Sequence, residues 1–303
     1  MVGGAGFIGS HLVDRLLAEN HHVDVVDNLS TGTLGNLAAA RAAGGDLKIH
    51  NLDVCSNEFT SLVAMRTPEV IFHLGWMVPG RTSPATLAAA VHGMINVLEA
   101  SRLLGSTKVV TAAPATAVYG EVPSREQPVK EGRSHTPAGA RSVICHAVLE
   151  LLAAYRRDHN VEFTALAMSS VYGPRQRRDG GVVAAFAEAI ERGDAPVIHG
   201  TGRQARDLLY IDDAVDACVR AATKGGGLVI NVGTGIATPI RDLWALLAPS
   251  ARNEPVHEPR YEPERPGEVG RLAVAPARAR IQLSWASWTP LETGLRNLRT
   301  TNG

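Results

Sequence analysis

The stretch VGGAGFIGSHLVDRLL, which runs from Val2 to Leu17, decides the fold. Its glycines Gly3, Gly6 and Gly9 have the spacing G-x-x-G-x-x-G and lead directly into apolar residues at helical spacing. Glycine permits a tight turn and a close approach of the backbone to a pyrophosphate. The helix that follows offers its free N–H groups and the positive end of its dipole to that anion. We therefore predict a loop that binds the pyrophosphate of a dinucleotide.

An acidic residue at the end of the next predicted strand indicates which dinucleotide binds. Asp27 closes this strand, where a carboxylate accepts hydrogen bonds from both hydroxyls of an adenosine ribose and repels the 2′-phosphate of NADP. We therefore predict NAD as the cofactor. Asp53 and Val54 come after a later strand and suit the edge of an adenine as well as an ordinary surface turn. The full set of predicted cofactor contacts is Gly3, Gly6, Phe7, Ile8, Gly9, Asp27, Asn28, Asp53, Val54, Leu74 and Gly75.

Strands and helices alternate through the first half of the chain. Amphipathic stretches such as Ser10–Asn20 and Thr86–Gly105 predict helices between short runs that are rich in β-branched residues. The predicted strands are Val23–Asp27, Leu47–Asp53, Val70–Gly75, Lys108–Ala113 and Phe163–Met168. This alternation predicts an α/β fold, a Rossmann-type doubly wound parallel sheet with a smaller α/β C-terminal substrate domain.

Composition excludes several classes of protein. Apolar residues make up 45% of the 303 residues, and thirty basic residues balance thirty acidic ones, which gives no push toward nucleic acid or a membrane surface. No apolar run reaches the roughly 18 residues of a membrane span. The three cysteines are widely spaced, so we predict no metal site and a reduced, cytoplasmic protein. Since only Met1 and Val2 precede the glycine loop, we expect a misassigned start or a trimmed chain.

A series of motifs spans almost the whole chain. In order they are GGAGFIGSHLVDRLL, VVDNLSTG, IFHLG, NVLEAS, AVYGE, VYGPRQ, GTGRQARDLLYIDDAVDA, NVGTG and RPGEV. With these motifs the chain resembles the extended short-chain dehydrogenase/reductases of the NAD-dependent epimerase/dehydratase family, in particular the UDP-galactose 4-epimerase-like branch. The resemblance implies that NAD takes a hydride from a sugar carbon while a tyrosine phenolate removes the hydroxyl proton. A lysine lowers the pKa of that tyrosine, and a serine or threonine supports the hydroxyl.

The positions of this proton relay are substituted. Counting from VYGPRQ and from Pro137 places Arg141 at the tyrosine position and Cys145 at the lysine position. Ala115, with Thr116 next to it, falls at the serine or threonine position. An arginine stays protonated and cannot act as a base, and a thiolate is too short to replace a phenolate in geometry.

Three interpretations of the substituted relay remain open. A register shift of one residue presents Ser142 and His146, a hydroxyl and an imidazole four residues apart on a helix. Alternatively, Thr116, Tyr119 or Cys145 takes over the proton transfer. In the third interpretation these side chains are what is left after catalysis was lost or changed.

The residues that we expect to bind the nucleotide sugar keep more of the family's pattern. Arg206 and Arg265 match positions that the resemblance assigns to the diphosphate of the nucleotide, a task that suits the planar, permanently charged guanidinium. Ser170 stands where the family usually has an asparagine, and Trp76 stands where small residues line the nicotinamide pocket. We expect Asp213 to cap the helix after the predicted strand LLYI.

Two hypotheses for the function follow. In the first, the chain is an NAD-dependent epimerase or dehydratase of a UDP- or dTDP-hexose with an atypical or lost proton relay. In the second, it is a non-catalytic sensor or partner subunit that binds NAD and a nucleotide sugar. We expect an NAD-binding domain in residues 1–166, joined by a strand near 228–233, and a nucleotide-sugar domain in residues 167–303. By analogy of fold we expect a homodimer through helices that include Thr86–Gly105 and Val143–Arg157.

Overall fold

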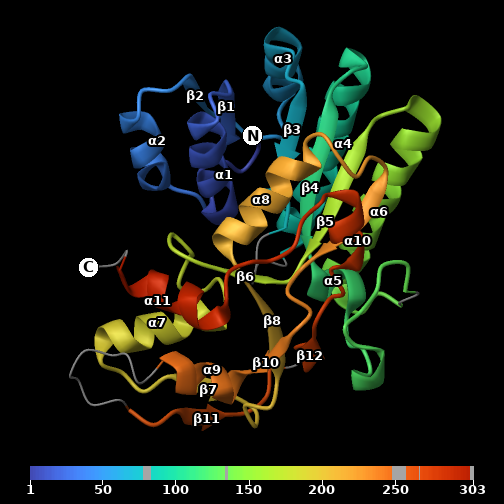
Figure 1. The fold of residues 1–303 in the computed structure, drawn as a ribbon. Coiled ribbons are helices and arrows are strands. Elements are labelled where there is room, and N and C mark those ends of the chain that lie inside the picture. The colour runs from blue at the N-terminus through green and yellow to red at the C-terminus, as the bar shows by residue number, and fades with distance from the viewer. Residues whose placement is uncertain (78–82, 134–135, 248–256, 266, 301–303) are drawn as a thin grey trace.

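A twisted parallel sheet with helices on both faces forms the larger part of the molecule (Figure 1). The computed structural model describes residues 1–77, 83–133, 136–247, 257–265 and 267–300. The predicted α/β class and parallel sheet are confirmed. A smaller region of short strands and helices lies beyond the carboxyl ends of the sheet strands (Figure 1).

The main sheet has two parallel parts that meet at Val2. The strands of the first part are β1 (Val23–Asp27) and β2 (Leu47–Asn51). Those of the second, in spatial order, are β3 (Val70–His73), β4 (Lys108–Pro114), β5 (Phe163–Met168) and β9 (Leu228–Val232). Val2 pairs in parallel with Val26 on one side and His73 on the other. This single residue therefore joins β1 to β3 and carries the glycine loop to the middle of the sheet.

Alternate residues of each strand feed two separate cores. Phe72 and Val110 pack into one core, whereas their neighbours Ile71 and Val109 pack into the other. Side chains alternate across a strand, so a sheet covered on both faces needs apolar residues at consecutive positions. This requirement explains why the strands are near-continuous apolar runs.

Helices cover both faces of the main sheet. On one face α1 (Phe7–Ala18) packs against α8 (Ile211–Ala221), and on the other α4 (Pro84–Leu104) packs against α6 (Gly139–His159) (Figure 1). Further short helical elements of the chain are η1 (Leu34–Leu37), α2 (Ala38–Ala42), α3 (Asn57–Arg66), α5 (Ala115–Tyr119), η2 (Ser124–Glu126) and α10 (Ala277–Gln282).

The smaller region contains two groups of strands. The first is built on β8 (Ala205–Tyr210), and the strands that pair with it are β6 (Ser170–Tyr172), β10 (Ala237–Pro239) and β12 (Arg271–Leu272). The second is the parallel pair of β7 (Val197–His199) and β11 (Arg260–Glu262). Its helices are α7 (Val182–Arg192), α9 (Ile240–Leu247) and α11 (Leu291–Thr300).

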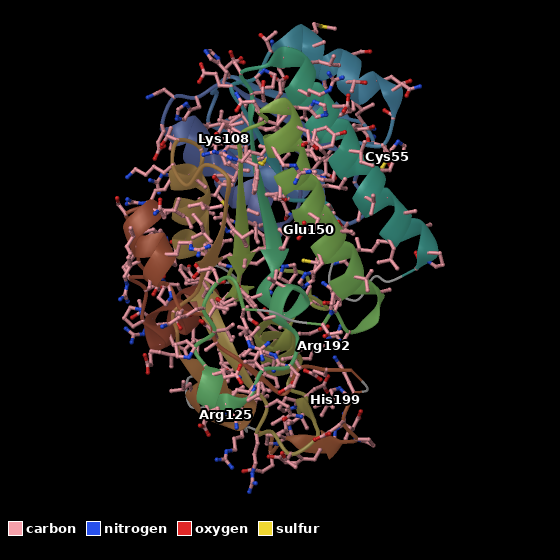
Figure 2. The ribbon with its side chains drawn as sticks, turned by 90° about the vertical axis from the view of Figure 1, so that its right-hand side faces the viewer. Cys55, Lys108, Arg125, Glu150, Arg192 and His199 are labelled. Atoms are coloured by element: carbon pink, nitrogen blue, oxygen red, sulfur yellow. The ribbon has the colours of Figure 1, made fainter. Side chains whose placement is uncertain are left out.

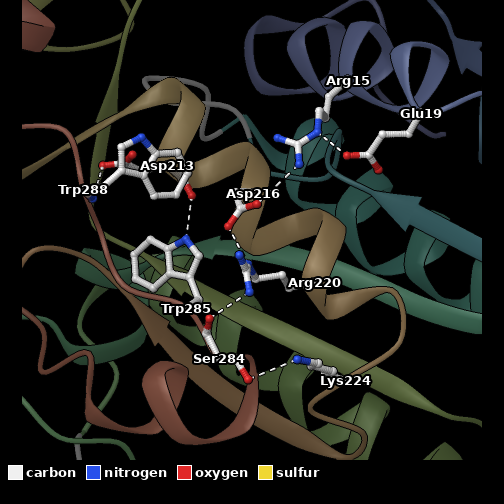
Figure 3. Close-up of polar contacts among 9 residues, drawn as sticks. All are labelled: Arg15, Glu19, Asp213, Asp216, Arg220, Lys224, Ser284, Trp285 and Trp288. Carbon is white, nitrogen blue, oxygen red and sulfur yellow. Dashed lines mark hydrogen bonds and ion pairs between the residues drawn. The ribbon is translucent and has the colours of Figure 1, made fainter.

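Polar groups of α8 hold the C-terminal segment against this helix (Figure 3). The expectation that Asp213 caps this helix is wrong, because no side chain caps its N-terminus and Asp213 lies inside its first turn. The buried Asp213 carboxylate instead accepts hydrogen bonds from the backbone N–H groups of Trp288 and Thr289 at 3.3 and 3.1 Å. The Trp285 indole N–H donates to the Asp213 carbonyl at 2.9 Å. The carboxylate therefore stabilises a tertiary contact and not the helix end.

Candidate dinucleotide and sugar site

The glycine loop leaves no room for side chains. Gly3 has a φ of +80°, and a Cβ added to it would lie 2.7 Å from the backbone N of Gly75. A Cβ on Gly9 would overlap the carbonyl oxygen of Gly3. Gly6 is the N-cap residue of α1, whose first turn has no side-chain cap and no acidic residue. The loop therefore presents open backbone N–H groups and the positive end of a helix dipole, which is what a pyrophosphate requires.

Asp27 is held at the rim of this loop by two backbone hydrogen bonds. Its Oδ2 accepts from the N–H of Ala5 and its Oδ1 from the N–H of Leu29, each at 2.9 Å. A carboxylate has about four acceptor sites, so this one is oriented and still able to accept hydroxyl groups. The geometry fits the two hydroxyls of a ribose.

The next two predicted cofactor residues meet beside the carboxyl ends of β1 and β2. The Asn28 amide donates to Asp53 Oδ2 at 2.9 Å, and the backbone N–H of Cys55 donates to Asp53 Oδ1 at 2.8 Å. The hydrogen bond from Cys55 is the main reason that the pKa of Asp53 lies below its usual value. Asn96 donates to the carbonyl of Val54 at 2.9 Å and fixes the same turn. The structure thus brings Asp27, Asn28, Asp53 and Val54 to one side of the glycine loop.

The end of β3 closes the opposite side of the loop. The N–H of Leu74 donates to the carbonyl of Val2 at 3.0 Å, and Gly75 lies directly against Gly3. The next side chain, Trp76, is only 4% exposed, and its indole N–H donates to Thr111 Oγ1 at 2.7 Å. The Trp76 ring therefore fills core volume on one face of the sheet.

Two side chains of the first turns of α6 fasten this helix to α5, which lies at the carboxyl end of β4 (Figure 1). The buried Ser142 hydroxyl donates to the carbonyl of Ala117 at 2.8 Å, and His146 Nε2 lies 2.9 Å from the carbonyl oxygen of Val118. In the tautomer or charge state that protonates Nε2, the imidazole donates to this carbonyl. The polar atoms of Ser142 and His146 therefore form packing contacts with the backbone of α5.

The residues at the tyrosine and lysine positions are not suited to proton transfer. Cys145 is completely buried, and burial raises the pKa of its thiol to about 12. Arg141 is half-buried, and its Nε is enclosed without a hydrogen-bond partner. Burial lowers the pKa of Arg141, yet a guanidinium stays protonated at any working pH. Neither side chain provides a base near neutral pH.

The hydroxyl of Tyr119 is also occupied. It donates to Asn231 Oδ1 at 2.6 Å in a buried contact, and burial raises the pKa of Tyr119 well above its usual value. Asn231 in turn donates from Nδ2 to the carbonyl of Val129 at 2.8 Å, and its backbone N–H donates to Glu131 at 2.9 Å. Sequence reasoning missed this network, although the two motifs that supply its ends, AVYG and NVG, were both recognised.

The two arginines that the resemblance assigns to the diphosphate lie near each other in the smaller region. Arg206 Nη2 donates to Glu268 Oε1 at 2.6 Å, and its side chain is only 12% exposed. The N–H of Glu268 donates to the carbonyl of the exposed Arg265 at 3.2 Å, so that residue lies on the same turn. Ser170 begins β6 and pairs with Leu208 on β8.

Asp207 is a positioning residue that the sequence did not suggest. It is 2% exposed, and its carboxylate accepts from the N–H groups of Thr234, Gly235 and Val274 and from the Thr234 hydroxyl, at 2.7–3.2 Å. Burial raises the pKa of Asp207, and these hydrogen bonds oppose that rise. Asp207 thereby fixes the strand that carries Arg206. Its signal in the sequence was a second charged residue, directly after Arg206, in a strand that continues with apolar residues.

In the ranges that the structure describes, no group of three or more His, Cys, Asp or Glu side chains is arranged to hold a metal ion. No helix within those ranges is long and apolar enough to cross a membrane.

Comparisons with known proteins agree with this geometry. Residues 1–233 match the sequence model of the family described as the NAD dependent epimerase/dehydratase family. A UDP-glucose 4-epimerase of Mycolicibacterium smegmatis is 38% identical over 302 residues, which cover 97% of this chain and 95% of that protein.

Two solved structures with the same overall fold are also of UDP-glucose 4-epimerases. A UDP-glucose 4-epimerase of Thermotoga maritima, solved with UDP-glucose, has a TM-score of 0.87 and 31% identity and covers 100% of this chain and 98% of its own. A Thermus thermophilus UDP-glucose 4-epimerase, solved with NAD, has a TM-score of 0.87 and 28% identity and covers 98% and 96% of the two chains. The expected cofactor, NAD, is the one that the family's description names. The chain therefore belongs to the NAD-dependent epimerase/dehydratase family.

Proposed function

We propose that this chain binds NAD and a UDP-hexose as a UDP-hexose 4-epimerase does, and that its proton relay is lost. One observation carries the proposal: the side chains at the tyrosine and lysine positions of α6, Arg141 and Cys145, cannot accept a hydroxyl proton near neutral pH. Such a chain senses NAD and nucleotide sugar, or serves as a partner subunit of an active enzyme.

The residues around the glycine loop fit NAD. The cradle between Gly3, Gly9 and Gly75 is one that any Cβ would fill, and the first turn of α1 is open to a pyrophosphate. Asp27 would hold the adenosine ribose and disfavour the 2′-phosphate of NADP. NAD, when bound, supplies a hydride acceptor and donor beside the sugar.

The smaller region supports binding of the nucleotide diphosphate. Arg206 is fixed in place by Asp207 on its own strand and by the carbonyl of Ala205, which accepts from Arg206 Nη1 at 3.1 Å. Glu268 would release the Arg206 guanidinium when a diphosphate arrives, and Arg265 is exposed on the neighbouring turn. The relatives named as UDP-glucose 4-epimerases support UDP as the nucleotide and a hexose as the sugar.

The loss of the relay follows from the groups that surround it. Arg141 keeps its proton and Cys145 has a raised pKa, so neither removes a hydroxyl proton near neutral pH. The Ser142 hydroxyl and the His146 imidazole are bonded to the backbone of α5, which argues against the shifted pair. Thr116 is half-buried, but on its own it lacks a base that would activate its hydroxyl.

Proton NMR of nucleotide-sugar turnover tests the proposal. Purified protein with NAD is incubated with UDP-glucose, UDP-galactose or dTDP-glucose, and calorimetry on the same sample measures binding of NAD and of each sugar nucleotide. We expect binding of NAD and a UDP-hexose without any new anomeric signal. A new anomeric signal from the unmodified chain would contradict the loss of the relay, and absence of UDP-sugar binding would contradict the proposal as a whole.

A variant that rebuilds the relay sharpens this test. Arg141→Tyr/Cys145→Lys/Ala115→Ser restores the three residue types that the family uses, and we expect it to produce the new anomeric signal. The matched control is Val143→Tyr/Ala147→Lys, which introduces the same pair at the same spacing on the exposed side of α6. We expect this control to remain inactive.

The arrangement of the chain is also part of the proposal. We infer an NAD-binding domain from residues 1–166 together with β9, and a sugar-nucleotide domain from residues 167–303.

A homodimer would use α4 and α6, which lie side by side on one face (Figure 2) and expose Leu103 and Val143 by 68% and 51%. Light scattering, which measures the molar mass in solution, tests for this dimer.

The free thiols of Cys55, Cys145 and Cys218 favour the reducing cytoplasm as the location of the protein, which cell fractionation tests.

A further inference from the structure

Strand β12 lies directly beside Arg206. Leu272 of β12 pairs with Arg206 of β8, and the carbonyl of Gly270, just before β12, accepts from the N–H of Ala205 at 2.9 Å. The same carbonyl also accepts from Arg206 Nη1 at 3.4 Å. Because β12 consists of only two residues, Arg271 and Leu272, its pairing with β8 provides few ladder hydrogen bonds. The position of β12 therefore depends on what holds the edge that faces away from β8.

The chain segment that follows α5 holds this second edge. The N–H of Val129 donates to the carbonyl of Ala273, and the carbonyl of Val129 accepts from the N–H of Ala275, each at 2.8 Å. The two bonds lie on either side of Val274, with which Val129 forms a parallel bridge. This is the hydrogen-bond pattern of a parallel strand pair. The segment therefore extends the sheet of the smaller region by one residue beyond β12.

The side-chain amide of Gln127 repeats this pattern two residues earlier along the edge. Its Nε2 donates to the carbonyl of Arg271 at 3.0 Å, and its Oε1 accepts from the N–H of Ala273 at 3.1 Å, so that the two bonds lie on either side of Leu272. The amide thus takes the place of a backbone peptide group in the ladder. A further hydrogen bond from Nε2 to the carbonyl of Val122, at 2.9 Å, fixes the amide in this orientation.

The three partners of the half-buried Gln127 require an amide. They are two carbonyl oxygens and one N–H group, so the side chain must donate twice and accept once. An ionised glutamate has nearly the same shape but no donor, and it would face both carbonyl oxygens. An alanine would remove all three bonds. The hold on β12 therefore depends on the chemistry of this one side chain.

We propose that Gln127 is a positioning residue for the diphosphate of the sugar nucleotide. Its amide fixes β12, and β12 fixes Arg206, whose guanidinium would bind the phosphate oxygens. A planar guanidinium binds phosphate well only in the correct orientation, and a group that is already held in place loses less freedom when the ligand binds. The inference rests on the proposed function, which assigns the diphosphate to Arg206. Gln127 acts through this arginine and not by contact with the ligand.

Calorimetric titration of the NAD-loaded protein with UDP and with uridine tests the inference. The ratio of the two affinities measures what the diphosphate contributes to binding. The variants are Gln127→Ala and Gln127→Glu, and the control is Gln282→Ala, which makes the same truncation at an exposed position of α10. We expect both variants at Gln127 to bind UDP about tenfold less tightly, with unchanged affinity for uridine and for NAD. The control should match the unmodified protein.

A double-mutant cycle with Arg206→Gln separates positioning from general damage to the fold. If Gln127 acts through Arg206, Gln127→Ala should change the affinity for UDP little once Arg206→Gln is present. The same loss in both backgrounds would overturn the inference, as would an equal loss of UDP and uridine affinity or an unchanged UDP affinity in Gln127→Ala. Each of these results leaves the proposed function standing, whereas lack of UDP binding by the unmodified protein would overturn the proposed function itself.

Discussion

The glycine loop and the first turn of α6 lie at the same edge of the sheet, but they are constrained in opposite ways. In the loop, Gly3 and Gly9 meet backbone atoms so closely that no larger residue fits. On α6, Ser142 holds the helix against α5, while Arg141 beside it has no hydrogen-bond partner for its enclosed Nε. Cofactor binding therefore depends on backbone shape, whereas the proton relay depends on side chains that the fold does not require. The second can change while the first is kept.

The largest effect is expected from a change in the loop. Gly3→Ala would force a side chain into a left-handed backbone and against the backbone of Gly75. We expect an unfolding free energy lower by roughly 3 kcal/mol and an affinity for NAD lower by about 100-fold or more. Thermal denaturation and calorimetric titration measure both quantities.

Gly44→Ala is the matched control for this change. Gly44 has a φ of +73°, close to that of Gly3, but a Cβ there would meet nothing within 4 Å. We expect only the backbone strain of about 1–2 kcal/mol and unchanged binding of NAD. Equal losses in the two variants would show that strain, and not the contact with Gly75, limits the loop.

A smaller effect is expected at the rim of the loop. Asp27→Asn removes the charge that accepts from Ala5 and that would accept from the ribose. We expect binding of NAD to weaken by roughly 10-fold to 100-fold, the range for a charge-assisted hydrogen bond. NADP is the internal control, because loss of the carboxylate removes the repulsion of its phosphate. A ratio of NAD to NADP affinity that stays constant would argue against a ribose contact at Asp27.

A change on α6 should affect stability and leave the cofactor site intact. Ser142→Ala removes the hydroxyl that donates to Ala117 and leaves that buried carbonyl without this partner. We expect a loss of about 1–2 kcal/mol in unfolding free energy with unchanged affinity for NAD. Val143→Ala, at the exposed neighbouring position, serves as control and should change stability little. Weaker binding of NAD in Ser142→Ala would instead show that this hydroxyl also supports the cofactor site.

The last effect is absent near neutral pH and appears only in alkaline solution, where stability depends on the Cys145 thiol. Its folded pKa of about 12 lies above that of an unfolded cysteine, near 8.5, so the folded state binds the proton more tightly. Stability from this group is present below about pH 8.5 and is lost, at roughly 1.4 kcal/mol per pH unit, as pH rises toward 12. Urea denaturation between pH 8 and 10.5 should show a shallower decline in Cys145→Ala. An unchanged slope would mean that the thiol ionises normally in the folded protein.

Sequence patterns were sufficient wherever one local rule sets the structure. The spacing of Gly3, Gly6 and Gly9 and the position of Asp27 predicted the loop and its rim, because turn geometry and strand ends are local properties. The partner of Asp213 could not be predicted, since Trp288 and Thr289 lie far along the chain and meet it only through packing. Whether the candidate relay residues are free to transfer a proton depends in the same way on tertiary contacts. Ser142 and His146 form an i, i+4 pair in any helix, but only the position of α5 assigns their polar atoms to backbone carbonyls.

The position of the Trp76 indole has a consequence for the fluorescence of the protein. This ring is buried beside Gly75, against which the glycine loop packs, and its N–H is fixed by Thr111. A rigid indole in an apolar setting emits at shorter wavelength than one in water, and the reduced nicotinamide absorbs in that spectral range. On the proposed function, with the other three tryptophans replaced by phenylalanine, we expect the emission of Trp76 to fall when NADH binds at the loop, without any turnover of a sugar.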